Sequence, residues 1–150
     1  MAFDITTTAG VVKTHLEGSG LFFAVDIIKP RSPVAEGPYA CIYPERMRVV
    51  ETTMVRTIEQ HVLRVEVYQA RHTQDDDDDA ISPSTLTAQV ANLFVGDFSL
   101  GGNVRNVDFG GQYGQALEAE FVDAEVARTP YHVSNITVPL IVDGDADFVA

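Results

Sequence analysis

The sequence of 150 residues contains one cysteine, no tryptophan and only ten basic residues. A lone cysteine, Cys41, excludes an internal disulfide and any zinc site built on paired cysteines. No apolar run approaches the roughly 18 residues that a membrane-spanning helix needs. The N-terminus carries Asp4 and a threonine cluster in place of a basic segment, so we expect no signal peptide. The length and the apolar content of 45% favour a single domain, residues 1–150, and the lone cysteine favours folding in a reducing cytoplasm.

Recognisable catalytic and cofactor motifs are also lacking. There is no G-x-S-x-G nucleophile elbow, and Gly18-Ser19-Gly20 is better interpreted as a helix stop. Gly110-Gly111-x-x-Gly114 lies between two expected strands, and neither lysine follows a phosphate-binding glycine loop. Cys41 falls within an expected strand and is interpreted as a small core residue. We therefore predict no catalytic residues, no enzymatic activity and no cofactor.

Metal-ligand patterns are incomplete. The four histidines, at positions 15, 61, 72 and 132, show no H-x-x-H or H-E-x-x-H spacing. His15-x-Glu17 matches half of a deaminase signature, but the cysteines that complete its zinc site are missing. Asp143-x-Asp145-x-Asp147 repeats the first three ligand positions of a calcium loop, but the glycine and the glutamate that such a loop needs further on are missing. We predict no specific metal site.

Charge is distributed unevenly along the chain. Residues 1–71 contain eight basic and eight acidic residues, whereas residues 72–150 contain fourteen acidic residues and only Arg105 and Arg128 as basic ones. The formal net charge of −12 therefore comes from the second half. Such a chain repels nucleic-acid phosphates instead of binding them. The asymmetry is typical either of a well-solvated surface or of a molecule whose two sides attract each other.

Apolar periodicity predicts two amphipathic helices. A stripe of period 3.6 within residues 5–16 predicts the first, and the glycines within residues 18–20 end it. Ser82-Pro83 provides an N-cap and a first helical residue for the second. Its apolar stripe runs over residues 86–94, and the glycine pair at 101–102 is its expected end.

Several β-strands are expected around these helices. Residues 46–60 favour extended structure, Pro44 closes the strand before them, and Pro139 places the last strand at a sheet edge or a bulge. The clearest strand, 61–69, alternates so that one side packs and the other faces water. The expected strands are 21–28, 39–43, 61–69, 104–109, 117–126 and 131–142. The expected core contains Ile5, Val12, Leu16, Leu63, Val65, Val67, Val90 and Leu93.

This order of elements predicts an α+β fold, a mostly antiparallel β-sheet with two α-helices packed on one face. Between the strand 61–69 and the second helix, Asp75, Asp76, Asp77, Asp78 and Asp79 form an unbroken acidic run. Five adjacent like charges favour a solvated loop over a specific metal site.

Taken together, the motifs resemble those of a known protein family. An N-terminal helix leads into Gly20-Leu-Phe-Phe-x-Val25, and residues 62–68 read VLRVEVY before the acidic loop. Gly96-Asp97 follows the second helix, with VRNVD at 104–108, GQYG at 111–114 and TVPLIV at 137–142. Over most of residues 4–142, this resembles the minor tail proteins that terminate siphophage tails, including the lambda-type tail terminator.

The resemblance implies a structural virion protein. In that family the subunits form a hexameric ring on the last ring of the major tail tube protein and present a surface to the head–tail connector protein. It implies a location at the head-proximal end of the virion tail, synthesis in the host cytoplasm, DNA passing through without specific binding, and no membrane. Alternatives are a head–tail connector or tail-tube protein or, in another class, a small metal-dependent hydrolase.

The neutral first half and the strongly acidic second half make the two sides of a subunit unlike. Unlike sides favour head-to-tail contacts, which close into rings when the rotation permits. The arginines of the first half are the expected ring-interface residues for a neighbour's carboxylates: Arg46, Arg48, Arg56 and Arg64. The acidic run 75–79 is expected to face the lumen of the ring or to form a mobile loop, where it would repel DNA.

Overall fold

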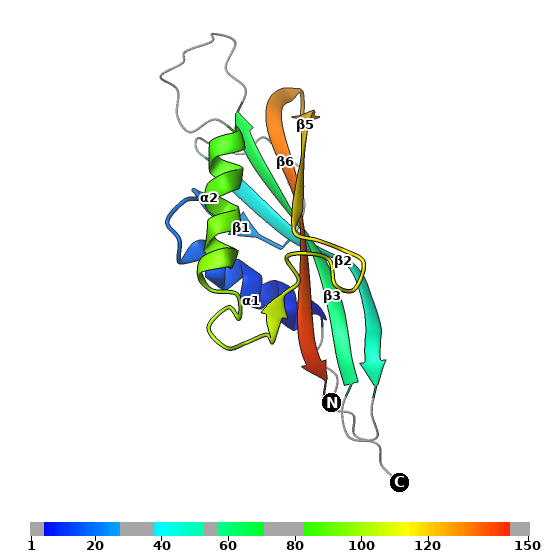
Figure 1. The fold of residues 1–150 in the computed structure, drawn as a ribbon. Helices are drawn as coiled ribbons and strands as arrows, with labels where there is room; N and C mark the ends of the chain where they lie inside the picture. The colour runs from blue at the N-terminus through cyan, green and yellow to red at the C-terminus, as the bar shows by residue number, and fades with distance from the viewer. Residues whose placement is uncertain (1–4, 28–37, 53–56, 71–82, 145–150) are drawn as a thin grey trace.

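The computed structural model describes residues 5–27, 38–52, 57–70 and 83–144 (Figure 1). These residues form two helices and one curled sheet of six strands. In chain order the elements are α1 (Ile5–Glu17), β1 (Ala24–Asp26), β2 (Tyr39–Thr52), β3 (Thr57–Ala70), α2 (Pro83–Gly96), β4 (Asn106–Val107), β5 (Glu118–Val126) and β6 (Thr129–Gly144). The fold is α+β, as the element order predicted.

The sheet has the strand order β1-β2-β3-β6-β4, and β5 also pairs with β6. All pairings are antiparallel except that of β1 with β2, so the sheet is mixed. The long strand β6 pairs with β3 along the whole length of β3, from Thr57 to Ala70. On its other side β6 pairs with β5 up to Thr137 and with β4 at Leu140 and Ile141. Two short elements therefore share one side of a single long strand.

Both helices lie on the same side of the sheet, as Figure 1 shows. Val12 and Leu16 of α1 and Phe94 of α2 are fully buried in one apolar cluster with the sheet. That cluster includes Leu63 and Val65 of β3. Fully burying one such side chain stabilises the fold by about 1.5–3 kcal/mol. The helix stripes read from the sequence are confirmed as the surfaces that cover the sheet.

The expected core residues are confirmed with one qualification. Six of the eight are buried, and none is exposed. Ile5 and Leu93 are partly buried and pack against the same cluster, because they lie at the margins of their helix stripes. Among the described residues, the largest fully buried side chain is Phe94, followed by Leu16, Ile42, Leu63, Leu86 and Leu140.

The start of α2 and the end of α1 agree with local sequence signals, whereas the end of α2 does not. Pro83 is the first residue of α2, a position where its missing N–H costs no hydrogen bond. The helix α1 ends at Glu17, and the amide of Gly18 donates to the carbonyl of Thr14 at 3.0 Å. The helix α2 ends at Gly96, earlier than the expected Gly101-Gly102. A turn at 97–103 follows in place of further helix.

The opposite face of the sheet is also covered, which corrects the prediction that one side of residues 61–69 faces water. Tyr68 of β3, Tyr39 and Cys41 of β2, and Tyr131 and Val133 of β6 form a second buried cluster. Ala124 and Val126 of β5 pack against it, because the β5–β6 hairpin curls with the sheet. Cys41 is fully buried, as expected of a small core residue.

Several strands differ in length from the prediction. The expected strand 21–28 reduces to β1, and Phe23 is 65% exposed, because pairing with β2 holds only three residues. The expected strand 104–109 similarly reduces to β4. In contrast, β2 continues through Pro44 to Thr52. A register shift between Pro44 and Arg46 accommodates the proline, and β1 does not extend that far along β2.

The predicted edge position of Pro139 is wrong, because β6 lies inside the sheet. Pro139 sits opposite Val62 of β3, between the parts of β6 that pair with β5 and with β4. Its carbonyl accepts a hydrogen bond of 2.9 Å from the amide of Asp108. Because a strand residue directs its nitrogen and carbonyl to the same side, the ring nitrogen also faces away from β3. The ladder between β3 and β6 therefore loses no bond.

Candidate functional site

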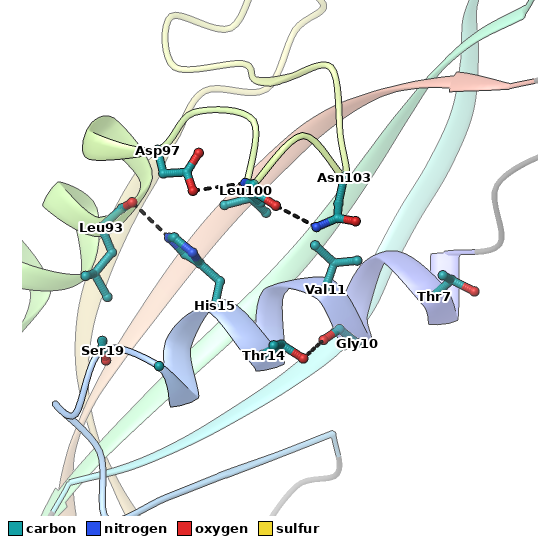
Figure 2. Close-up of a pocket in the computed structure, with 12 residues that line it drawn as sticks. Thr7, Gly10, Val11, Thr14, His15, Ser19, Leu93, Asp97, Leu100 and Asn103 are labelled. Carbon is teal, nitrogen blue, oxygen red and sulfur yellow. Dashed lines mark hydrogen bonds between the residues drawn. The ribbon is translucent and has the colours of Figure 1, made fainter.

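A hollow in the described surface lies between α1 and the turn that follows α2 (Figure 2). Its volume is about 660 Å³. It is open to solvent and has a mixed polar and apolar lining. The lining residues are Thr7, Gly10, Val11, Thr14, His15, Gly18, Ser19, Leu93, Asp97, Leu100, Gly101 and Asn103.

The polar side chains that line this hollow mainly form hydrogen bonds to backbone carbonyls of the elements around it. His15 Nε2 lies 2.9 Å from the carbonyl oxygen of Leu93, which ties α1 to α2. The hydroxyl of Thr14 donates to the carbonyl of Gly10 at 3.0 Å. The hydroxyl of Ser19 similarly donates to a carbonyl of α1, that of Leu16, at 2.5 Å. A hydroxyl that donates to its own helix is not activated as a nucleophile by a neighbouring base.

The turn at 97–103 is organised by Asp97. Its Oδ2 accepts a hydrogen bond of 2.9 Å from the amide of Gly101. Gly101 and Gly102 have φ of 72° and 84°, a region that glycine adopts without steric cost. Asn103 Nδ2 donates to the Leu100 carbonyl at 2.8 Å. These bonds hold the turn in its own conformation, and the hollow lies between this turn and α1.

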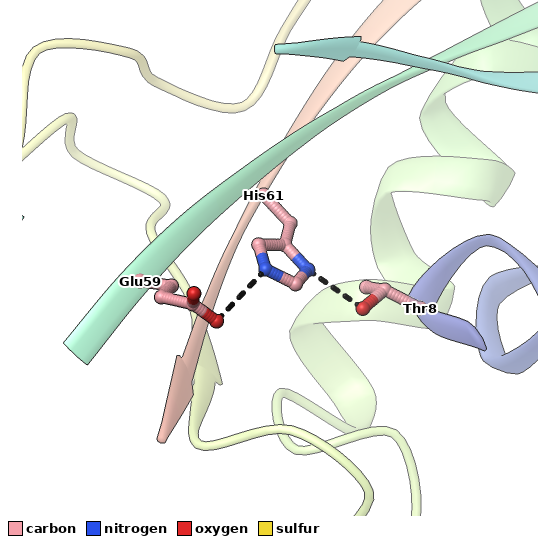
Figure 3. A network of polar contacts seen from close by, with 3 residues as sticks. All are labelled: Thr8, Glu59 and His61. Atoms are coloured by element: carbon pink, nitrogen blue, oxygen red, sulfur yellow. Dashed lines mark hydrogen bonds and ion pairs between the residues drawn. The ribbon is translucent and has the colours of Figure 1, made fainter. Parts of the chain in front are cut away.

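A second polar group is buried beneath α1 (Figure 3). Thr8 Oγ1 lies 2.7 Å from His61 Nδ1, and His61 Nε2 lies 3.4 Å from Glu59 Oε2. Hydroxyl, imidazole and carboxylate follow the order of a nucleophile, base and orienting acid. However, His61 and Thr8 are fully buried, Glu59 is 4% exposed, and none of them lines the hollow. The arrangement fits a structural link between α1 and β3, a buried polar site that histidine spacing did not reveal.

The other described histidine lies on the surface. His132 Nδ1 on β6 is 2.8 Å from Asp123 Oδ1 on β5, and both side chains are substantially exposed. They are direct cross-strand neighbours. An exposed pair of this kind contributes about 0–1 kcal/mol.

Hydroxyl groups of the tyrosine cluster face carboxylates. Tyr39 donates to Asp26 at 2.9 Å and Tyr68 donates to Glu66 at 3.1 Å. Burial, together with these carboxylates, raises the pKa of both tyrosines above the ordinary value. Burial and then Glu66 similarly raise the pKa of Tyr43. The three phenols therefore stay neutral donors far into the alkaline range.

The four expected interface arginines occupy different environments. Arg46 and Arg48 lie in the exposed part of β2. Arg48 Nε also donates to Gln60 Oε1 at 2.8 Å. Arg64 forms an ion pair of 2.8 Å with Glu45 on the adjacent strand, so it is already engaged within the chain. Arg56 lies outside the described residues. By strand register, Arg46, Arg48 and Arg64 share the face of the sheet away from the helices, and their role at an interface stays a prediction.

The acidic run Asp75, Asp76, Asp77, Asp78 and Asp79 lies outside the described residues, as do His72, Asp145 and Asp147. Asp143 lies 3.6 Å from Arg105 Nη1 and is thereby held beside β4. Within the described ranges, no group of three His, Cys, Asp or Glu side chains is placed to hold a metal ion. None of the helices in these ranges is long and apolar enough to cross a membrane.

The strand β5 has an exposed surface that the sequence pattern did not indicate. Residues 118–123 are all exposed, and the remaining three are exposed or partly buried. Ala119 and Phe121 alternate with Glu118 and Glu120, yet Phe121 is 54% exposed. Alternation shows which residues share a face, but not whether anything packs on that face.

The chain was compared with protein-family models and with curated protein sequences, and neither comparison found a match. The site is therefore interpreted from its own geometry.

Proposed function

We propose that this protein is a ring-forming subunit that caps the tail tube of a long-tailed bacteriophage and provides the tail-side surface for head attachment. The family resemblance of the sequence supplies the identity and the number six. One structural observation supports a ring: two strand edges of the sheet differ in charge. The exposed part of β2 holds Arg46 and Arg48 together with Glu45 and Glu51, and Glu45 is already paired with Arg64. In contrast, β5 holds four carboxylates and no basic residue.

Unlike edges favour contacts between different surfaces of identical subunits. A two-fold dimer places identical patches together, and a dimer through β5 would place carboxylates against carboxylates. A head-to-tail contact instead brings arginines to carboxylates, and repeating it closes a ring when the rotation is right. A cap that stops tube growth needs such a closed ring, and it needs no chemistry.

The test is the position and stoichiometry of the chain in assembled particles. Cryo-electron microscopy of virions that carry it should show one ring, between the tail tube and the connector, with the subunit number of the tube ring. Deleting the gene should give tubes of uncontrolled length. Absence from virions, or a dimer on the tail, would contradict the proposal.

A head–tail connector or tail-tube protein is the nearest alternative, because it also forms rings. The same images separate these functions: a connector subunit would contact the head, and a tube subunit would repeat along the tail. The described residues hold no observation that favours the metal-dependent hydrolase.

A further inference from the structure

Within the described residues, two strand edges of the sheet lack a neighbouring strand over part of their length. The strand β1 pairs with β2 only as far as Cys41, and no described strand lies beside the outer edge of β2 at residues 46–49. The strand β5 pairs with β6 on one side only. Unpaired N–H and C=O groups along such an edge are ready to accept another strand.

These edges lie at diagonally opposite corners of the sheet. The strand β5 flanks the half of β6 near Tyr131, level with the start of β2. The open part of β2, residues 46–49, flanks the other end, beside residues 59–62 of β3. Copies joined through these edges are staggered along the strands, so the strands tilt relative to the ring axis. Closed barrels of strands show the same relation between stagger and tilt.

Strand directions fit a head-to-tail contact. From β2 to β3, from β3 to β6 and from β6 to β5 the direction reverses each time, so β5 runs opposite to β2. A second copy in the same orientation therefore presents its β2 antiparallel to β5 of the first. The alternation of strands then continues across the contact without interruption.

The faces of the two strands match in chemistry. On the face away from the helices, β2 directs Arg46 and Arg48, opposite Val62 and Gln60. On the same face, β5 carries Glu118 and Glu120, which lie opposite Thr137 and Asn135 of β6.

On the helix-bearing face, the stretches 47–49 of β2 and 119–121 of β5 carry apolar side chains. Met47 and Val49 of β2 are 49% and 54% exposed, and Phe121 of β5 is 54% exposed. Cross-strand pairing would cover these side chains with one another, and each favourable cross-strand pair adds to the stability of the contact. Charges thus meet on one face, and apolar side chains meet on the other.

We propose that β5 of one copy adds as an antiparallel strand to the open edge of β2 of the next, with Glu120 opposite Arg46 and Glu118 opposite Arg48. In this register Ala119 faces Met47, and Phe121 lies diagonally beside Met47, within reach of a large side chain. A tail ring as the setting of this contact rests on the proposed function. The pairing itself is a property of the purified chain.

Cysteine cross-linking tests the pairing directly. Met47→Cys and Ala119→Cys place thiols on directly opposed residues, whose expected separation suits a disulfide. The native Cys41 is fully buried and stays in place. Two differently tagged full-length variants are mixed at millimolar concentration and oxidised mildly. We expect the mixed disulfide dimer, and a ladder of larger species from the double variant.

A matched control is Thr7→Cys, on the exposed surface of α1. A mixed dimer no more abundant than with this control would overturn the proposal. Self-linking of Ala119→Cys that equals the mixed product would also overturn it, because that result indicates two-fold pairing of β5.

Charge reversal tests the register. Glu118→Arg with Glu120→Arg in the Ala119→Cys copy should lower the mixed product about tenfold, the effect of replacing two exposed attractions by repulsions. Arg46→Glu with Arg48→Glu in the Met47→Cys copy should restore the product, which also shows that the reversed chains fold. An unchanged yield after the first reversal contradicts the charge matching.

The result is separable from the proposed function. Cross-links in solution with no chain found on tails would leave the pairing intact and remove the tail assignment. A chain found on tails whose cysteine pair fails to cross-link would overturn the pairing alone.

Discussion

The two faces of the sheet are buried in different ways. On the helix-bearing face, aliphatic side chains of β3 and β6 pack against α1 and α2 around Phe94. The exception on this face is the buried polar group at His61. On the other face, tyrosines pack against one another, with the Tyr68 and Tyr131 rings 6.0 Å apart and nearly perpendicular. The first face is stabilised by apolar area, the second by aromatic contacts and hydroxyl–carboxylate bonds. Stability should therefore respond differently to changes on each.

The largest effect is expected at the centre of the helix-bearing face. Phe94→Ala removes the largest fully buried side chain and should lower the free energy of unfolding by about 3–5 kcal/mol. Urea unfolding followed by circular dichroism measures it. The partly buried neighbour Leu93 is the matched control, and Leu93→Ala should cost clearly less. Equal losses would show that Phe94 is not the centre of the packing.

The buried polar link should give the next effect. Thr8→Val keeps the side-chain volume but removes the hydroxyl beside His61 Nδ1, so we expect a loss of about 1–3 kcal/mol. Thr14→Val on the exposed side of the same helix is the control and should change stability by less. A Thr8→Val variant as stable as the parent would show that this hydrogen bond contributes nothing.

The tyrosine face should respond more weakly and with a dependence on pH. Tyr68→Phe removes one hydroxyl donor to Glu66 at a cost of about 0.5–1.5 kcal/mol. The folded chain raises the pKa of Tyr68 above its ordinary value of 10.0, so the unfolded chain loses the phenolic proton first. The contribution of the protonated Tyr68 hydroxyl to stability is fully present below pH 10 and declines as the pH rises above 10.

Stability measured between pH 8 and 11 checks this sign. The parent chain should lose stability above about pH 10 more steeply than Tyr68→Phe. A Phe94→Ala chain, altered on the other face, should keep the steep decline of the parent. Parallel curves for the parent and Tyr68→Phe would contradict the role assigned to this hydroxyl.

The smallest effect on the isolated chain is expected at β5, because the side chains of its residues 118–123 are exposed on both faces of the sheet. Phe121→Ser should change the free energy of unfolding by no more than about 0.5 kcal/mol. The same variant should lower association between copies, measured by sedimentation at high protein concentration. A large loss of stability would show that Phe121 packs within its own chain.

Local periodicity was sufficient to predict the helices and the central strand. The stripes of α1 and α2 and the alternation around Leu63 each depend on neighbours in sequence, so they could be read directly. The extent of β2 through Pro44 and the inner position of Pro139 could not. Both depend on which distant strand lies beside the proline, and long-range pairing determines that.

The candidate surfaces were predicted only in part. The charge difference between the halves of the chain was visible, but not that Arg64 is paired with Glu45 while Arg46 is exposed. The burial of His61 and the exposure of Phe121 depend on what covers each face. Composition and spacing carry no information on that.

The pairing of β3 with β6 has a consequence for how the chain reaches its structure. The partners range from Ala70 with Tyr131 to Thr57 with Gly144, so they are distant in sequence although they are neighbours in the sheet. Such contacts require closing a large loop before they stabilise anything, and folds dominated by them typically form in milliseconds to seconds. During synthesis, β3 cannot form this ladder until β6 has emerged from the ribosome.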